Sequence, residues 1–245
     1  MAFMRKRGIT ISERNTKADS VYSELRRRIV EAELAPGEKL SEERIAGEFN
    51  VSRSPVKEAL TRLAAEELVE IYPQVGSIVS PLSTEKYRDV LEMRLLLEPY
   101  TAERAALKVS DEALQELQAL LDDIAGEAPG TRAYAIKLWK IDDRLHDALR
   151  KATGNREIDT LLEGYHSYVH RTRVATGLWA DRLLPSLSEI RAIFDALKRR
   201  SPADAREAMK IHISNIRKAY EKICELQDKN NKSSETYGGQ ESSVN

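Results

Sequence analysis

Apolar side chains recur every three or four residues along most of the chain, a period that predicts helices. The pattern changes once, after Leu68, where β-branched segments on either side of residues 73–76 predict a small β-hairpin. From residue 84 onward every periodic segment is helical, and the predicted helices cover residues 84–108, 111–125, 131–152, 155–177, 181–199 and 202–228. The pattern therefore predicts a mainly α protein, in which a small unit with a hairpin precedes an all-α six-helix bundle.

Two short helices precede the predicted hairpin, and a helix near residues 18–34 precedes both. The earlier of the two begins at Ser41, a favourable N-cap, and the later one begins after Ser52. Only residues 50–52 separate them. This connection suits a helix-turn-helix, whose second helix docks in the major groove of DNA. With the hairpin as its wing, the N-terminal unit is predicted to be a winged helix-turn-helix.

The ends of the chain differ from the rest. Residues 1–18 and 229–245 are polar and lack periodicity, so both are predicted to be disordered tails. Between them, the winged helix-turn-helix is assigned to residues 19–80 and the helical domain to residues 84–228.

The composition restricts the class of protein. The net charge of −1 over 245 residues argues against a protein that coats nucleic acid regardless of sequence, because such binding neutralises many phosphates. The single cysteine, Cys224, cannot form an internal disulfide, as suits a reducing compartment. No apolar run approaches the roughly 20 residues that cross a membrane. We therefore expect a cytoplasmic protein without a membrane segment.

These features resemble the GntR family of bacterial transcription regulators. The matching motifs are residues 34–40 (LAPGEKL), 41–46 (SEERIA), 51–60 (VSRSPVKEAL), 62–63 (RL) and Gly76. The helical part resembles the FCD ligand-sensing domain of the FadR subfamily through residues 94–98, 142–146 (DDRLH) and 154–155 (GN). The resemblance implies a homodimeric regulator, not an enzyme, that binds a palindromic DNA operator and responds to a small carboxylate effector.

Two residues depart from the family pattern. Glu67 stands where the family usually has the glycine that ends the recognition helix, which favours a different turn into the wing. Lys57 stands where many relatives have arginine, and it offers a point charge without the bidentate fork of a guanidinium.

Contacts to DNA are expected from the start of the recognition helix and from the wing. Arg53 and Lys57, four residues apart, lie on one helical face and are candidates for reading bases, whereas hydroxyls and other cations nearby suit phosphates. The residues expected to contact DNA are Arg44, Ser52, Arg53, Ser54, Lys57, Arg62 and Gly76. The alternative is that the cations among them are ordinary surface charges.

A metal site is the sharpest hypothesis for the helical domain. Asp142 and His146 project from the same face of one helix, and His212 lies on the inward stripe of the last helix. The resemblance implies a further histidine about 22 residues before His212, where this chain has Ile190. Three ligands can still hold zinc, nickel or manganese with open positions for water or effector. The alternative is a hydrogen-bonded polar pocket without a metal.

Arg94 lies inside an apolar run, an unusual place for a cation without a partner. The family resemblance implies that it lies near the pocket, where its guanidinium would bind an effector carboxylate. A structural salt bridge with Glu98, one turn later, is the alternative for this arginine. Arg171, Arg173 and Asn215 are weaker candidates for the same pocket.

Two other functions remain open. Without a metal, the pocket could be apolar and take a larger ligand such as an acyl chain. A di-iron metalloenzyme is the remote alternative, because such bundles need two Glu-x-x-His motifs and this chain has one, at residues 163–166.

Overall fold

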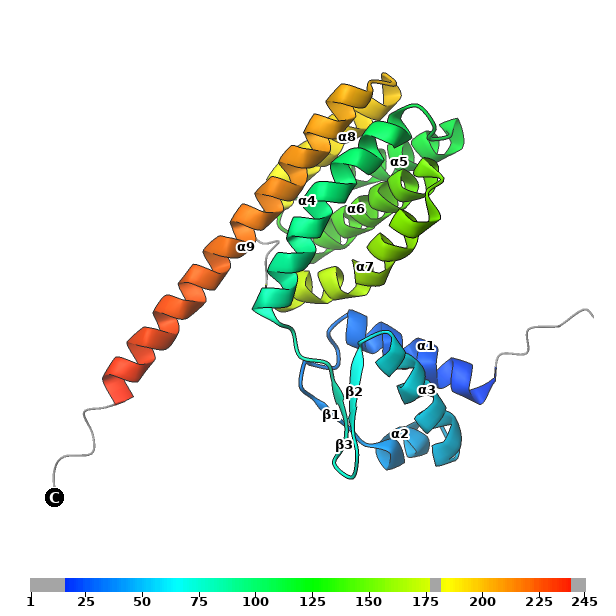
Figure 1. The fold of residues 1–245 in the computed structure, drawn as a ribbon, viewed down its shortest axis with the longest axis vertical. Coiled ribbons are helices and arrows are strands. Elements are labelled where there is room, and N and C mark those ends of the chain that lie inside the picture. The colour runs from blue at the N-terminus through cyan, green and yellow to red at the C-terminus, as the bar shows by residue number, and fades with distance from the viewer. Residues whose placement is uncertain (1–15, 177–181, 239–245) are drawn as a thin grey trace, which may run out of the picture. The chain divides into compact units, whose positions relative to one another are not determined.

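The computed structural model describes residues 16–176 and 182–238. The chain divides into two compact units, Met1–Pro81 and Leu82–Asn245 (Figure 1). The tails at residues 1–15 and 239–245, about which the sequence predicts disorder, lie outside the described residues.

The first unit places three helices against a small antiparallel sheet. Its elements are α1 (Lys17–Val30), β1 (Lys39–Leu40), α2 (Glu42–Glu48), α3 (Arg53–Ala65), β2 (Val69–Tyr72) and β3 (Gly76–Val79). Strand β3 lies between β1 and β2, and Tyr72 pairs with Gly76 where the hairpin turns. Helices α1 and α3 bury Leu25 and Leu60 in one core. The prediction of a helix-turn-helix with a hairpin wing is confirmed.

The helix α1 begins earlier than the sequence analysis expected. Lys17 and Ala18, assigned there to a disordered tail, form its first turn. Thr16 and Asp19 form a capping box, in which each side chain accepts a hydrogen bond from the other residue's backbone N–H. This reciprocal cap satisfies backbone donors that would otherwise be unpaired, and therefore fixes the helix start.

The recognition helix α3 ends on a residue with left-handed backbone. Glu67 has φ 56°, and the N–H groups of Glu67 and Leu68 donate to the carbonyls of Ala64 and Leu63, respectively. These two bonds form a Schellman motif, the ending that glycine most often makes. The expectation that glutamate would close this turn differently is therefore wrong: the hydrogen bonds impose the left-handed conformation on Glu67.

Because a side chain with Cβ is strained in this conformation, we expect Glu67→Gly to stabilise the first unit by about 0.5–1 kcal/mol. Urea unfolding followed by circular dichroism measures the change. Ala64→Gly, inside the same helix, is the matched control and should destabilise by about 1 kcal/mol. An unfolding free energy that is unchanged or lower in Glu67→Gly would show that contacts of the glutamate side chain outweigh the strain.

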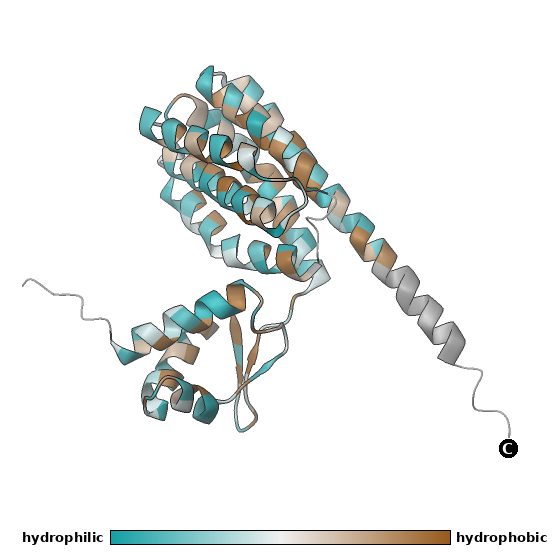
Figure 2. Ribbon diagram, turned by 180° about the vertical axis from the view of Figure 1, so that it is seen from behind, coloured by the Kyte–Doolittle hydropathy of each residue, from teal (hydrophilic) through white to brown (hydrophobic). Residues whose placement is uncertain are grey.

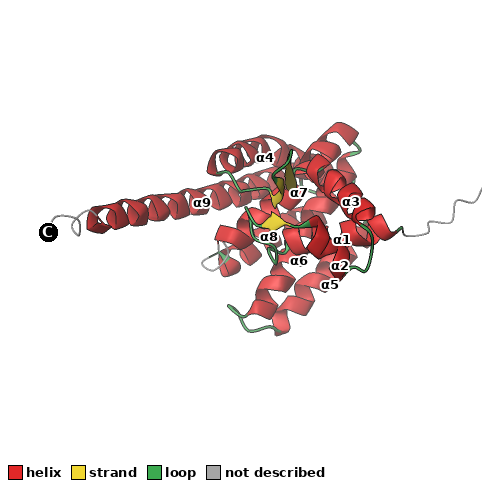
Figure 3. Ribbon diagram, turned by 90° about the horizontal axis from the view of Figure 1, so that it is seen from below, coloured by secondary structure: helices red, strands yellow, loops and turns green. Residues whose placement is uncertain are grey.

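The second unit is built from helices. They are α4 (Thr84–Ala106), α5 (Asp111–Asp123), α6 (Arg132–Thr153), α7 (Arg156–Thr176), α8 (Leu183–Lys198) and α9 (Pro202–Gly238), with a short 3-10 turn η1 (Ile124–Gly126) after α5. Among the described residues of this unit no strand occurs, as the colouring in Figure 3 shows. The prediction of an all-α domain is confirmed.

Helices α4 and α9 lie side by side and run in opposite directions (Figure 1). The rings of Tyr87 and Tyr220 meet edge to face at 4.4 Å near one end of α4, and Arg206 pairs with Glu103 near the other. Figure 2 shows hydrophobic and hydrophilic residues alternating around the helices, so that each helix offers an apolar side to the shared core. None of the described helices combines the length and apolar character required to span a bilayer.

The last helix continues past the predicted end. The sequence predicts an end at residue 228 and a disordered tail over residues 229–245, whereas α9 extends to Gly238. No proline or glycine interrupts the chain between residues 203 and 236. Adding a residue to an existing helix costs little, because nucleation is already complete. Polar composition alone therefore does not end a helix.

Candidate functional site

The three predicted metal ligands lie close together inside the second unit. Asp142 and His146 project from α6, and His212 projects from α9. One donor atom of each lies within 4.8 Å of the others. The Oδ1 atom of Asp142 is 3.2 Å from Nε2 of His212 and 3.5 Å from Nε2 of His146. Asp142 and His212 are completely buried.

These three atoms are close to one another without hydrogen-bonding. Oδ1 of Asp142 and both Nε2 atoms are buried and make no hydrogen bond with any described residue. A buried polar atom without a partner is costly, and lone pairs that face one another need a proton or a metal ion between them. The donor set of one carboxylate and two imidazoles suits a divalent transition metal. By this criterion the residues fit a metal ion.

The far side of each imidazole is held by a glutamate. Nδ1 of His146 is 2.9 Å from Glu98 of α4, and Nδ1 of His212 is 2.9 Å from Glu189 of α8. In many metal sites the Nδ1–H of a histidine donates a hydrogen bond to such a carboxylate, and Nε2 is the ligating atom. Burial lowers the pKa of His146, but the carboxylates of Glu98 and Asp142 outweigh burial and raise this pKa to about 9. The carboxylates around His146 therefore favour a positive charge at this position, either on the protonated ring or on a metal ion bound to it.

The second oxygen of Asp142 is held by an arginine. Arg173 of α7 lies 2.6 Å from Oδ2 of Asp142 and 3.7 Å from Asp143. Burial raises the pKa of Asp142, but Arg173 and His146 outweigh burial and hold this pKa well below its usual value. The carboxylate is therefore charged, and one oxygen remains for a metal.

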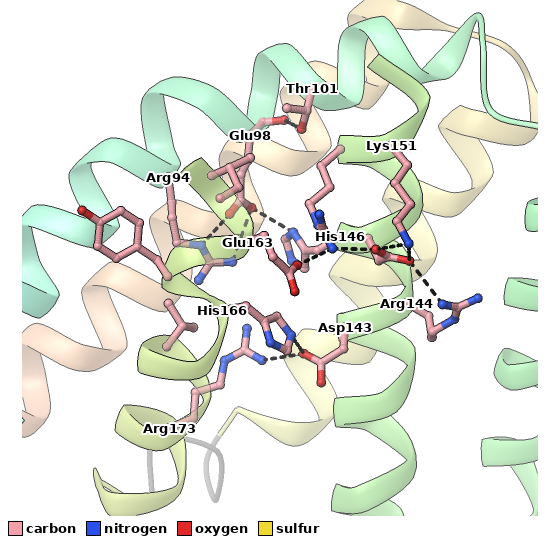
Figure 4. A pocket seen from close by; sticks show the side chains of 15 residues that line it. Arg94, Glu98, Thr101, Asp143, Arg144, His146, Lys151, Glu163, His166 and Arg173 are labelled. Carbon is pink, nitrogen blue, oxygen red and sulfur yellow. Dashed lines mark hydrogen bonds and ion pairs between the residues drawn. The ribbon is translucent and has the colours of Figure 1, made fainter. Parts of the chain in front are cut away.

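A cavity of about 400 Å³ opens beside His146 (Figure 4). Helices α4, α6 and α7 form its wall. Arg94 of α4 lines it, pairs with Glu98 at 2.5 Å, and has a buried Nη1 without a hydrogen-bond partner among the described residues. Burial lowers the pKa of Arg94, but Glu98 outweighs it and raises the pKa above the ordinary arginine value. The salt bridge with Glu98 is thus present, and the contact of Arg94 with an effector carboxylate stays a prediction, for which Nη1 is the donor that remains.

The rest of the cavity wall is strongly polar. Lys151 pairs with Asp147, and Arg150 pairs with Glu163. The charged side chains in the wall are Arg94, Glu98, Asp143, Arg144, His146, Asp147, Arg150, Lys151, Glu163, His166 and Arg173. Such a lining is suited to a hydrophilic ligand and poorly suited to a long acyl chain.

The other predicted pocket residues lie elsewhere. Asn215 donates to Glu189 at 2.8 Å and does not line the cavity. Arg171 is buried outside the cavity wall, and burial lowers its pKa. Ile190 is buried in the apolar core and carries no donor atom.

The sequence alone does not point to Glu189, and it identifies Glu98 only as a salt-bridge partner of Arg94. Arg173, a weaker candidate for the effector pocket, lines the cavity and also holds Asp142. No spacing rule links Glu189 to His212, because the two lie on different helices. A signal was nonetheless present: Glu189 and Ser186 stand among apolar residues of α8, and a charged residue near the buried face of a helix needs a partner.

In the first unit, the start of α3 is exposed and rich in donors. Ser52 is the N-cap of α3, yet its side chain makes no capping hydrogen bond. Arg53 and Ser54 are exposed, and Arg53 lies 3.2 Å from the exposed carboxylate of Glu43. Lys57, also exposed, forms no ion pair with any residue that the structure describes. Backbone N–H groups at a helix start and nearby cations suit phosphate.

Three other residues predicted to contact DNA differ in their surroundings. The guanidinium of Arg62 pairs with Asp19 at 2.8 Å and lies 4.0 Å from the centre of the Tyr22 ring, so it fastens α3 to α1. Arg44 is exposed and lies 3.6 Å from Glu38. Gly76 is exposed in the hairpin turn and has φ 119°, a backbone conformation that residues with a side chain rarely adopt.

A winged helix-turn-helix joined to a helical unit with a buried polar cavity defines a DNA-binding regulator with a ligand-binding domain. Residues 17–79 match the bacterial regulatory proteins of the gntR family, and residues 89–215 match the FCD domain. The chain belongs to the GntR family of transcription regulators, in the group that carries an FCD domain. The regulators of this family bind DNA, and the FCD domain binds small-molecule effectors.

Several known proteins are similar to this chain. The HTH-type transcriptional repressor RspR of Escherichia coli is 31% identical over 208 residues, which cover 83% of this chain and 88% of RspR. The gluconate operon transcriptional repressor of Bacillus subtilis is 38% identical over 112 residues, 46% of this chain and 45% of that protein. Among solved structures, Escherichia coli McbR/YncC has a TM-score of 0.67 at 18% identity and covers 84% of this chain and 98% of its own. This last likeness is one of fold.

Proposed function

We propose that this chain is a homodimeric transcription repressor that senses a small hydrophilic organic acid through a divalent metal. The observation that carries the proposal is the convergence of three buried, unpartnered donor atoms beside a cavity lined by charged side chains. Repression is supported by two relatives that are named repressors, RspR and the gluconate operon repressor.

In the proposed complex with DNA, α3 of each protomer enters the major groove of one half of a palindromic operator. Arg53 and Lys57 read base edges from exposed positions near the start of α3. Ser52, Ser54 and Arg44 contact phosphates, and the wing approaches the DNA backbone at Gly76. We assign Arg62 to holding α3 on α1 rather than to DNA, because Asp19 and Tyr22 already engage its guanidinium.

For the metal, Oδ1 of Asp142 and Nε2 of His146 and His212 are the proposed ligands of zinc, nickel or manganese. When bound, the metal supplies a positive centre with open coordination positions for oxygen ligands. Ile190 offers no fourth donor, so at least one more position is left to water or effector than in relatives with a histidine there. Each proposed ligand is held through an atom other than the ligating one: His146 by Glu98, His212 by Glu189 and Asp142 by Arg173.

For the effector, the buried Nη1 of Arg94 is the proposed partner of a carboxylate. The polar wall favours a hydrophilic acid over an acyl chain, which needs an apolar pocket to gain from burial. Effector binding is proposed to change the operator affinity, a coupling that is typically about 1–3 kcal/mol. A di-iron enzyme gains no support, because Glu163 and His166 are each engaged by a charged partner, Arg150 and Asp143.

Elemental analysis of protein purified without chelator tests the proposal. We expect close to one divalent metal ion per chain in the wild type, and its loss in His146→Ala and in His212→Ala, because each removes one of three ligands. His166→Ala is the matched control: this histidine lines the same cavity but pairs with Asp143, so the metal should remain.

Wild-type protein that neither contains a metal nor takes one up from nickel or zinc solution would contradict the metal site. The three side chains would then form a hydrogen-bonded pocket, and the effector would be a ligand that needs no metal. Absence of sequence-specific binding to the promoter region of its own gene would contradict the regulator as a whole.

A further inference from the structure

The imidazole of His212 is held by a residue of another helix, Glu189 of α8. Its Nδ1 lies 2.9 Å from Oε2 of Glu189, while its Nε2 faces Asp142 at 3.2 Å. His212 is completely buried and the side chain of Glu189 is only one-tenth exposed. The contact is therefore shielded from water and has a fixed geometry.

Every described partner of the Glu189 carboxylate is a donor. Arg182 donates to both oxygens, at 2.9 Å to Oε1 and 2.5 Å to Oε2, which is the bidentate arrangement of a guanidinium with a carboxylate. Asn215 donates to Oε1 at 2.8 Å. These three hydrogen bonds fix the carboxylate in place and leave Oε2 able to accept a further hydrogen bond, from Nδ1–H of His212.

This arrangement decides which nitrogen of His212 can bind a metal. Since a carboxylate can only accept, the Nδ1 atom that contacts Glu189 must carry hydrogen. In the neutral imidazole the lone pair is then on Nε2, the atom that faces Asp142 and His146. The hydrogen bond also fixes the rotation of the ring, because Nδ1 is bonded to a carboxylate that Arg182 and Asn215 both hold in place.

We propose that Glu189 is a positioning residue of the metal centre, which sets the tautomer and orientation of His212 and thereby the affinity for the metal. Helix α8 thus contributes to the centre through Glu189, although the adjacent Ile190 provides no ligand. This inference rests on the metal site of the proposed function. It concerns a residue outside the three proposed ligands and outside the cavity wall.

Glu189 tests this idea more cleanly than Glu98 does. Glu98 holds His146 in the same way, but it also pairs with Arg94 and lines the cavity, so its replacement would disturb the effector pocket as well. Glu189 does not line the cavity, and its other described partners are Arg182 and Asn215. The isosteric variant Glu189→Gln removes the negative charge and keeps the shape of the side chain.

The experiment is a titration of metal-free protein with Ni²⁺, followed by calorimetry and by competition with a chelator of known affinity. We expect Glu189→Gln to bind Ni²⁺ about 10- to 100-fold more weakly than the wild type, the usual effect of removing a residue that orients a ligand. Glu103→Gln is the matched control: it breaks a glutamate–arginine pair between α4 and α9, at Arg206, and should leave the affinity unchanged.

Two further measurements separate positioning from general stability. The melting temperature of the metal-free variant measures the loss of the largely buried pair with Arg182 and should fall. The absorption spectrum of the Co²⁺-loaded variant reports on the metal centre and should differ from that of the wild type, because the His212 ring is no longer held in one orientation. If Glu189→Gln does not fold, Asn215→Ala loosens the same carboxylate without touching His212 and should weaken Ni²⁺ binding in the same direction.

The outcomes distinguish the positioning role of Glu189 from the metal site itself. Equal Ni²⁺ affinity in wild type and Glu189→Gln would overturn the role of Glu189 while leaving the metal site intact. A lower melting temperature with unchanged affinity would show that Glu189 only supports the fold. A wild type that binds no Ni²⁺, Zn²⁺ or Mn²⁺ would overturn both the positioning role and the proposed metal site.

Discussion

Replacement of both Arg53 and Lys57 by alanine is expected to abolish sequence-specific DNA binding. Each good contact to a base edge contributes about 1–3 kcal/mol of discrimination, so two lost contacts correspond to a reduction of roughly 30-fold to 10⁴-fold. Both side chains are exposed at the start of α3, and the fold should remain intact. The measurement is a titration of operator DNA, and of a scrambled duplex, at fixed salt concentration.

The matched control for charge is the double variant Arg104→Ala, Lys210→Ala. It removes two exposed cations from α4 and α9 of the other unit, and operator affinity should change little. Wild-type affinity and specificity in the α3 double variant would show that this helix does not read the bases. An equal loss in both double variants would assign the effect to net charge.

The second large effect is expected from Glu98→Ala, which should destabilise the helical unit by about 3–5 kcal/mol. The carboxylate of Glu98 pairs with Arg94 at 2.5 Å and with His146 at 2.9 Å, and all three side chains are largely buried. Its removal leaves buried donors and a buried cation without their partner. Urea unfolding of the metal-free protein, followed by circular dichroism, measures the change.

Two comparisons make this result specific. Glu103→Ala removes a partly exposed carboxylate of the same helix, whose pair with Arg206 contributes at most about 1 kcal/mol. Arg94→Met combined with Glu98→Leu replaces the pair by apolar side chains and should recover much of the stability, since no buried charge is left alone. A loss of less than about 1 kcal/mol in Glu98→Ala would mean that water reaches Arg94 and His146.

The fold was largely predictable because its information is local. Helical periodicity located the helices of both units, and Ser41 and Ser83 cap α2 and α4 through side-chain hydrogen bonds. The errors also have local causes: the capping box at Thr16 begins α1 early, and hydrogen bonds hold Glu67 in a glycine-like conformation. In both places a few hydrogen bonds to the backbone determine the local conformation, although the residue types there suggest a different one.

The candidate metal site was predictable only in part. Asp142 and His146 belong to one helix face, and the inward stripe of α9 identified His212. The roles of Arg173 and Glu189 depend on how α7 and α8 pack against α6 and α9, which no spacing along the chain encodes. Asn215 shows the same limit, since it lies near the site but supports Glu189 rather than facing the cavity.

The formal charges of the proposed metal ligands and of the residues that hold them determine how the binding of metal and of effector would be coupled. With both imidazoles neutral, as metal ligands must be, the acids are Asp142, Glu98 and Glu189, and the arginines that pair with them are Arg173, Arg94 and Arg182. These charges cancel, so a divalent ion would bring an uncompensated positive charge into a buried site. An anionic effector is the natural counterion, and we expect metal and effector each to raise the affinity for the other, which makes the domain a sensor of both together.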